Sequence, residues 1–370
     1  MSKIYDCALA ALAAVTAASA QSTVTLSGTY RFAYQKDLST SYRSATSNSN
    51  VQQIGSNSSA AATAPADLSI RSGQGLTVTD ANLKLAAVED LGGGMKASFD
   101  YLLESGAFRG SAFTRADSGI GLSTPMGNVD LRNTRHSDLI TAIGSSAINL
   151  PDGLYDASGI VTRSAIDTLT YTAPAIMGVT TSVTYVENND GAINLAGTNA
   201  VPANTAAYVL GAAYANGPIS IRAAYKTAPS DKTASSGLTP KSNFEVAVAY
   251  DLGVAKVSYA FDGATNSGVS AAAAGTANSA GTNLSAAEAQ AIANMSTKAA
   301  HGVSVHVPFG AASVGVEWYK RDVQKVFAYG AKYDFSKRTA VGLSIATKSG
   351  LTSTQGYKGQ QYRLGVTHTF

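Results

Sequence analysis

The chain has 370 residues, of which 45% are hydrophobic and only 14% are charged, against about 25% charged residues in typical soluble domains. It carries 27 Lys and Arg against 24 Asp and Glu, a net charge of +3, and its mean hydropathy is +0.03. No stretch after the N-terminus reaches the ~20 apolar residues of a transmembrane helix. The composition therefore disfavours a helical membrane protein and, more weakly, an ordinary soluble enzyme. A β-barrel fits better, because its alternating lipid-facing and water-facing residues average out.

The first residues predict a secretory signal peptide. Lys3 opens a short basic region, an apolar run follows from Cys7 to Val15, and Ala18-Ser19-Ala20 has the form of a signal-peptidase site. A short helix of the folded domain is the alternative interpretation. Cleavage after Ala20 would remove Cys7, the only cysteine, and so exclude disulfides, Cys-ligated metals and a Cys nucleophile. We therefore expect a signal peptide over residues 1–20 and one domain over residues 21–370.

Strand patterns fill most of the remaining chain. In the first segment, Val24, Leu26 and Phe32 alternate with Thr25, Ser27 and Arg31, which is the period of a half-buried strand. Nine tyrosines fall near strand ends on the apolar faces, as in the aromatic girdle of a membrane barrel: Tyr34, Tyr101, Tyr185, Tyr214, Tyr225, Tyr250, Tyr259, Tyr333 and Tyr362. Sixteen such segments start near residues 22, 76, 95, 112, 127, 165, 178, 205, 218, 242, 253, 299, 311, 325, 338 and 358.

The connections between these segments alternate in length. Tight turns are expected at residues 90–94, 125–127, 216–218, 251–253, 308–310 and 334–337, and long polar connections at 36–75, 135–164, 188–204, 229–241 and 264–298. Short turns at one end and long loops at the other are typical of outer-membrane barrels, with short periplasmic turns and long extracellular loops. An even strand count brings both termini of the domain to the short-turn end, where the first and last strands can close the sheet. The prediction is an all-β, 16-stranded antiparallel transmembrane β-barrel.

The sequence resembles the general diffusion porins of Gram-negative bacteria, specifically the sixteen-stranded trimeric kind of beta-proteobacteria. The resemblance runs through the whole domain and is carried by Gln21–Gly28, Glu89–Ala97, Ile120–Ser123, Asp167–Pro174, Tyr333–Thr339 and Gly365–Phe370. It implies an outer-membrane channel for passive diffusion of ions and small hydrophilic solutes, a homotrimer, and contact with outer-membrane lipids and lipopolysaccharide. It also implies that the third long loop, residues 135–164, folds into the barrel and narrows the pore. The C-terminal Phe370 resembles the signal read by the barrel-assembly machinery.

Charge inside the barrel is the candidate functional feature. By alternation, Arg31, Lys84, Arg115, Arg132, Arg222 and Arg363 face the lumen, and Lys96, Lys226, Lys256 and Lys332 do so nearer the strand ends. Asp100, Asp117, Asp130 and Glu245 are the lumen acids, and the third loop carries Arg135, Asp138, Asp152, Asp156 and Arg163. Basic wall residues opposite an acidic loop would set up a transverse field and a preference for anions. Alternatively, these charges are merely solvated or paired across the lumen.

Two positions depart from the family's pattern. The family usually has a basic residue near position 82, where this chain has Asn82. It also often has Arg at position 116, where this chain has Ala116 next to Arg115.

Motifs for bond chemistry are sparse. Ser304 and His306 share one strand face, but an i, i+2 pair keeps their heads about 7 Å apart, so we interpret His306 as a pore-wall residue. Gly92-Gly93-Gly94 lacks the Lys-Ser/Thr of a phosphate loop, and no metal-ligand spacing occurs. We expect no cofactor, no metal, no nucleic-acid partner and no enzyme activity. An outer-membrane hydrolase and a plugged, adhesin-type barrel stay open as alternatives. Residues 284–295 predict a short helix within a surface loop.

Overall fold

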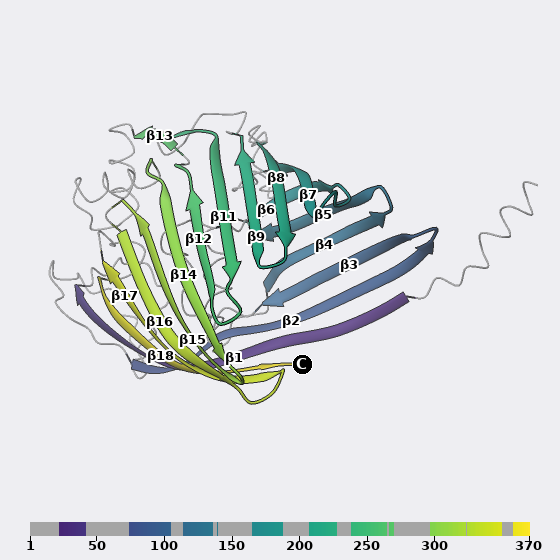
Figure 1. The fold of residues 1–370 in the computed structure, drawn as a ribbon. Helices are drawn as coiled ribbons and strands as arrows, with labels where there is room; N and C mark the ends of the chain where they lie inside the picture. The colour runs from purple at the N-terminus through teal and green to yellow at the C-terminus, as the bar shows by residue number, and fades with distance from the viewer. Residues whose placement is uncertain are drawn as a thin grey trace, which may run out of the picture.

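The computed structural model describes residues 22–41, 74–104, 114–135, 139, 165–187, 207–227, 238–264, 266–269, 297–322, 324–349 and 358–370. Within these ranges the chain forms one continuous curved wall of antiparallel strands (Figure 1). The strands are β1 (Ser22–Ser41), β2 (Gln74–Gly92), β3 (Met95–Glu104), β4 (Thr114–Thr124), β5 (Gly127–Arg135), β6 (Ala165–Thr172), β7 (Val179–Glu187), β8 (Ala207–Asn216), β9 (Ile219–Lys226), β11 (Asn243–Asp251), β12 (Lys256–Asp262), β14 (Ala300–Phe309), β15 (Ala312–Arg321), β16 (Gln324–Asp334), β17 (Thr339–Ser349) and β18 (Lys358–Thr369). Two further short strands, β10 (Leu238–Pro240) and β13 (Asn266–Val269), pair only with each other.

Each barrel strand pairs with its neighbours in chain order, and β1 pairs with β18 to close the barrel. This confirms the predicted sixteen-stranded antiparallel barrel. The predicted starts agree closely with the structure; the largest offset is at β12, expected near residue 253 and beginning at Lys256. Closure gives every strand two hydrogen-bonded neighbours. Backbone N–H and C=O groups need such protein partners in a bilayer, because no water is present to form hydrogen bonds with them. No helix among the described residues is long and apolar enough to cross a bilayer.

The expected loops differ from the structure in three places. β1 continues to Ser41, so the first connection begins at residue 42 rather than 36. The polar residues at the end of β1 still pair with β18. The sheet of β10 and β13 was not predicted, because strands of three and four residues are too short to show alternation. β15 ends at Arg321 and β16 begins at Gln324, so one connection at the loop end is as tight as a turn. The helix predicted over 284–295 lies outside the described residues.

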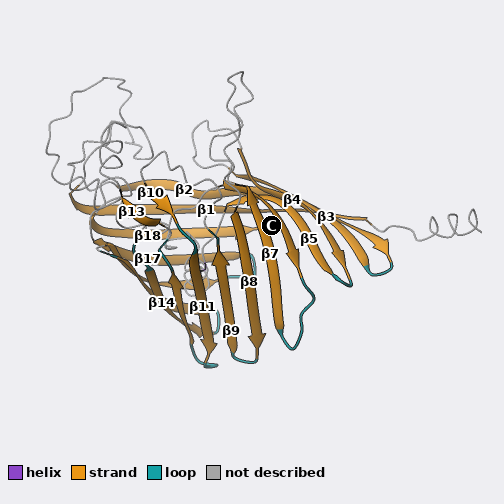
Figure 2. Cartoon of the chain, turned by 90° about the horizontal axis from the view of Figure 1, so that it is seen from above, coloured by secondary structure: helices purple, strands orange, loops and turns teal. Residues whose placement is uncertain are grey.

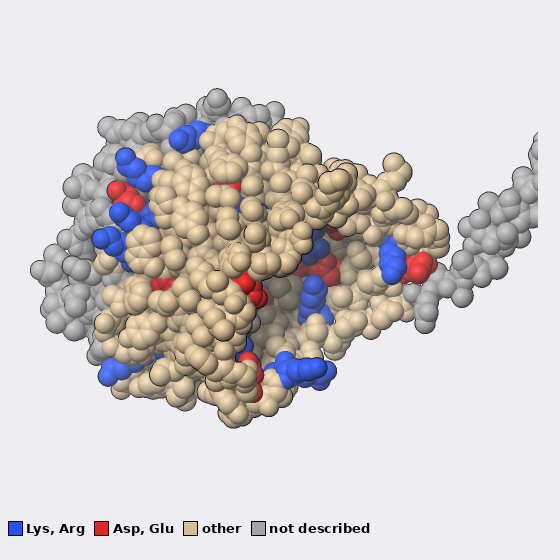
Figure 3. All heavy atoms as spheres, in the orientation of Figure 1, with Lys and Arg blue, Asp and Glu red and all other residues tan. Residues whose placement is uncertain are grey.

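The strand register separates two faces. Leu131, Leu169 and Tyr185 lie in one cross-strand row and point to the outer surface. All nine predicted girdle tyrosines lie on this outer face, in register with its other residues. Figure 2 shows the strands as one curved wall from a second side. In the space-filling view, acidic and basic side chains are visible within a hollow of the molecule (Figure 3). The alternation read from the sequence therefore predicted the faces correctly.

The closing seam joins the two ends of the chain. Gly28 and Phe370 exchange two backbone hydrogen bonds, both of 3.1 Å. A Cβ at position 28 would collide with the Phe370 ring and come within 2.7 Å of the Asn82 carbonyl oxygen. The absence of a side chain at Gly28 thus lets the C-terminal ring lie across the seam, with Phe370 still 51% exposed on the outer face.

Candidate functional site

The inner face holds most of the bases that alternation predicted to line the pore. Register places Arg31, Lys84, Arg132 and Arg222 in the rows that alternate with the hydrophobic outer rows. Arg31 forms an ion pair with Asp80 at 3.1 Å. Asp80 also accepts a hydrogen bond from the Asn82 amide at 3.1 Å, and the Asn82 amide oxygen accepts one from the Thr29 backbone N–H. Asn82, one of the two departures from the family pattern, thus supports the acid that holds Arg31.

A single carboxylate binds two of the predicted bases. The Arg132 guanidinium donates two hydrogen bonds to Asp100, from Nη1 at 2.8 Å and from Nη2 at 2.7 Å. The Lys84 ammonium lies 3.4 Å from the same carboxylate. Bidentate Arg–carboxylate geometry fixes the guanidinium plane as well as its distance. Strands β2, β3 and β5 therefore hold two cations around one acid on the inner wall.

The remaining predicted residues have different outcomes. Arg222 lies on the inner face and is exposed. The backbone of Arg115 pairs with Leu103, directly beside a register shift in the β3–β4 pair, and its side chain lies outside the described part of the structure. The Arg135 side chain and loop residues Asp138, Asp152, Asp156 and Arg163 also lie outside it. Their orientation stays a prediction.

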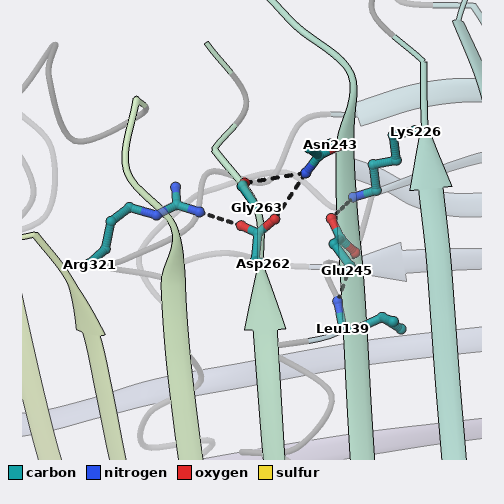
Figure 4. Close-up of polar contacts among 7 residues, drawn as sticks. All are labelled: Leu139, Lys226, Asn243, Glu245, Asp262, Gly263 and Arg321. Atoms are coloured by element: carbon teal, nitrogen blue, oxygen red, sulfur yellow. Dashed lines mark hydrogen bonds and ion pairs between the residues drawn. The ribbon is translucent and has the colours of Figure 1, made fainter. Parts of the chain in front are cut away.

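Beyond the end of β5, one residue of the third loop is described, and it touches the inner wall. Leu139 donates its backbone N–H to the Glu245 carboxylate on β11, at 3.3 Å (Figure 4). It also packs against a buried cluster of inner-face side chains that includes Ala260 and Tyr319. Glu245 is 1% exposed and forms an ion pair with Lys226 of β9. Leu139 thus contacts the inner wall at β11, and the inward fold of residues 135–164 as a whole stays a prediction.

A second buried network lies beside this contact. Asp262 of β12 accepts hydrogen bonds from Arg321 of β15 and from the Asn243 amide, the latter at 3.1 Å (Figure 4). Asp262 and Arg321 share one cross-strand row, with Ala300 of β14 between them. The small side chain at Ala300 lets the two charges meet across the intervening strand. The sequence alone did not predict this ion pair. Asp262 and Arg321 lie opposite each other only because of the register between β12, β14 and β15, which alternation within one strand does not reveal.

The bases of the inner wall are more exposed than the acids that bind them. Side-chain exposure is 29% for Arg31 against 16% for Asp80, and 45% for Lys84 and 33% for Arg132 against 16% for Asp100. The base is also more exposed than the acid in the Lys226–Glu245 and Arg321–Asp262 pairs. Lys332 and Asp334, beside a turn, are the exception. Water and solutes in the lumen thus meet the cation of most pairs first.

The Ser304 hydroxyl is buried, which is unfavourable for the catalytic role that a Ser304–His306 pair would need. Ser304 is 1% exposed, so its hydroxyl is closed to a substrate in the lumen. His306 lies two residues further along the same inner face. In the part of the chain that is described, no group of three or more His, Cys, Asp or Glu side chains could hold a metal ion.

Comparisons with known proteins agree with this architecture. A family model described as Gram-negative porin matches residues 8–353. The anion-selective porin from Comamonas acidovorans aligns with a TM-score of 0.60 and 19% identity, covering 95% of this chain and 100% of that one. A triple mutant of the Rhodopseudomonas blastica porin aligns with a TM-score of 0.55 and 15% identity, covering 94% and 100%. At such identities the structural likeness supports the fold alone. No curated protein matches the chain.

Proposed function

The chain belongs to the Gram-negative porin family and forms an outer-membrane channel, and from this premise we propose that the channel passively conducts ions and small hydrophilic solutes with a preference for anions. The family match spans most of the chain, and the closed barrel supplies the lumen. Wall charges, rather than bond chemistry, are then the means by which the protein selects solutes.

The observation that carries the anion preference is the unequal exposure within the wall ion pairs. Lys84 and Arg132 are more exposed than their shared partner Asp100, and Arg222 is exposed on the same face. An ion close to the wall therefore meets the positive partner first in the pairs around Asp80 and Asp100. Fixed positive charge raises the local concentration of anions, and salt weakens the effect with a Debye length of ~10 Å at 0.1 M. The anion-selective relative from Comamonas acidovorans supports the same proposal by analogy.

A triple variant tests this proposal. Replacing Arg31, Lys84 and Arg132 by Gln should shift the reversal potential in a KCl gradient towards cations, because Asp80 and Asp100 lose their counter-charges. The matched control replaces Lys320, Lys325 and Arg338, which are equally charged but lie on the outer face or a turn. The control should keep the native reversal potential. An unchanged reversal potential in the inner-face variant would refute the assignment of selectivity to these residues.

The rival functions make different predictions. A barrel hydrolase needs an accessible nucleophile, and the buried Ser304 is a poor one. Lipid or peptide hydrolysis that is lost in Ser304→Ala would favour the hydrolase. A plugged adhesin-type barrel would give no current steps in a planar bilayer, whereas a channel gives discrete steps.

The finer aspects of biogenesis and assembly are also proposals. Residues 1–20 act as a cleaved signal peptide, so mass spectrometry of the purified protein should find Gln21, or its cyclised form, at the N-terminus. Three copies assemble into a trimer surrounded by outer-membrane lipids and lipopolysaccharide, and the native mass in detergent should correspond to three chains. Retention of residues 1–20, or a monomeric mass, would reject the corresponding proposal.

A further inference from the structure

A row of basic side chains crosses the outer face of three neighbouring strands at the long-loop end of the barrel. His301 of β14 pairs directly with Lys320 of β15, and Lys320 pairs directly with Lys325 of β16. Lys320 is the last residue but one of β15, and Lys325 is the second residue of β16. Each of the three lies between two buried residues, as Lys320 lies between Tyr319 and Arg321. All three side chains therefore point outward, and both lysines are exposed.

The two lysines face each other without a matching number of acids. Cross-strand partners have Cα atoms about 5 Å apart, and like charges placed directly opposite each other destabilise a sheet. The row ends in neutral residues on both sides, because His301 pairs with Phe261 and Lys325 pairs with Ser349. One acid is near in sequence, Asp322 in the connection after β15. Among the described residues no ion pair joins an acid to either lysine, and two ammonium groups beside one carboxylate leave a net positive charge.

An aromatic row lies directly below the basic row, two residues further into the strands. Tyr259, Trp318 and Phe327 share one cross-strand row on the outer face, with Val303 between Tyr259 and Trp318. The Tyr259 hydroxyl and Nδ1 of His301 form a hydrogen bond of 3.0 Å, so Nε2 is the ring nitrogen left to bind a ligand. Aromatic rings of this kind lie at the membrane interface. The basic row, two residues or ~7 Å further along the strands, is therefore at the level of lipid headgroups.

We propose that His301, Lys320 and Lys325 form a docking site for the phosphate groups of lipopolysaccharide on the outer wall of the barrel. The site rests on the proposed lipid surroundings to the extent that the long-loop end must face the outer leaflet. A phosphate supplies the missing negative charge and several acceptor oxygens for the ammonium and imidazole donors. The acyl chains of the same molecule would lie along the aromatic and aliphatic rows below. Charge and apolar surface thus match the two parts of one phosphorylated lipid.

Native mass spectrometry of the detergent-solubilised barrel tests this site, with purified lipid A, the phosphorylated lipid anchor of lipopolysaccharide, as the probe. The native protein should retain lipid A more tightly than dephosphorylated lipid A and more tightly than phosphatidylglycerol. The double variant Lys320→Gln, Lys325→Gln should bind lipid A roughly thirtyfold more weakly, the effect expected of two lysines beside an anionic lipid surface. The same variant should bind dephosphorylated lipid A as the native protein does, because the apolar rows are unchanged.

A matched control removes the same charge at the opposite end of the barrel. Lys337→Gln with Arg338→Gln changes two exposed residues of the short turn between β16 and β17, and it should bind lipid A as the native protein does. Equal lipid A affinity in the Lys320/Lys325 variant and the native protein would refute the site. Equal affinity of the native protein for phosphatidylglycerol would refute the assignment to lipopolysaccharide.

The reversal potential in KCl separates this site from the proposed function. In phospholipid bilayers without lipopolysaccharide, the Lys320/Lys325 variant should keep the native value, because both side chains lie outside the lumen. Cation preference of the native channel would contradict the proposed function and leave the docking site standing. Unchanged lipid A binding in the variant would contradict only the docking site.

Discussion

At the scale of single residues, Asp100 decides how much positive charge the wall presents. It binds Lys84 and Arg132 together, and it is less exposed than either base. A carboxylate in this position orients the two cations while it offsets part of their charge. Replacing Asp100 by Asn separates these two effects on Lys84 and Arg132. Asn has the size of Asp and can still accept a hydrogen bond, but it carries no negative charge.

Asp100→Asn should therefore strengthen the preference for anions. The two bases keep a polar neighbour but lose their counter-charge, so the chloride-to-potassium permeability ratio should rise by roughly twofold for one unit charge in a high-dielectric lumen. The measurement is the reversal potential in a KCl gradient. Glu89→Gln, which removes an exposed acid near the short-turn end of β2, serves as the control. A shift of Asp100→Asn towards cations would contradict the account.

Asp262 has a structural role instead. Its carboxylate and the Arg321 guanidinium are both almost fully buried, at 2% and 7% side-chain exposure. Removing one partner of a buried pair leaves the other charge uncompensated, which costs about 3 kcal/mol or more. Asp262→Asn should lower the free energy of unfolding by about that amount, and heat-induced loss of the folded band in detergent should occur at lower temperature. Glu89→Gln should leave the unfolding temperature unchanged; equal stability of Asp262→Asn would be evidence against this role.

At the scale of elements, the closing pair of β1 and β18 depends on Gly28. The Phe370 ring occupies the space that any side chain at position 28 would need. Gly28→Val should therefore reduce the yield of closed barrel, because the new side chain meets both the ring and the Asn82 backbone. Heat-modifiable migration on gels reports the closed fraction.

The proposed assembly role of Phe370 predicts a different outcome from the packing at Gly28. Deleting Phe370 should lower outer-membrane assembly in cells, while the channels that do insert keep their native conductance. Refolding of the purified deletion into detergent should succeed, because the backbone pairing of β1 with β18 continues through Thr369. Normal assembly of the deletion in cells would count against the targeting role.

The sequence predicted the strands and their faces because alternation is a local property. Lys84 and Arg132 could be placed on the inner face because each is the direct neighbour of an outer-face leucine, Leu85 and Leu131 respectively. The ion pair between Asp262 and Arg321 could not be predicted in this way, because it depends on the register of three neighbouring strands. Arg115 shows the limit of counting: a register shift in the β3–β4 pair interrupts the alternation between it and Ser118. Local pattern predicts orientation, and only the folded sheet determines partners.

At the scale of the whole molecule, the barrel wall divides into two parts. Around β2, β3 and β5 the charged inner side chains are partly exposed. From β11 to β17 the inner face is mostly buried, with Glu245, Asp262, Ser304, Glu317 and Ser344 all at most 2% exposed. Leu139 lies against this second part. Ions in the lumen are therefore expected to follow the exposed bases of the first part.

The reversal potential of the native channel in a KCl gradient tests this account most directly. With the two sides at about 0.1 M and 0.01 M, where screening extends over ~10 to 30 Å, the sign should show chloride as the more permeant ion. The potential should fall towards zero when the same tenfold gradient is set near 1 M, where the Debye length is ~3 Å. A potential that shows potassium as the more permeant ion at low salt would contradict the assignment of selectivity to the exposed bases of the wall.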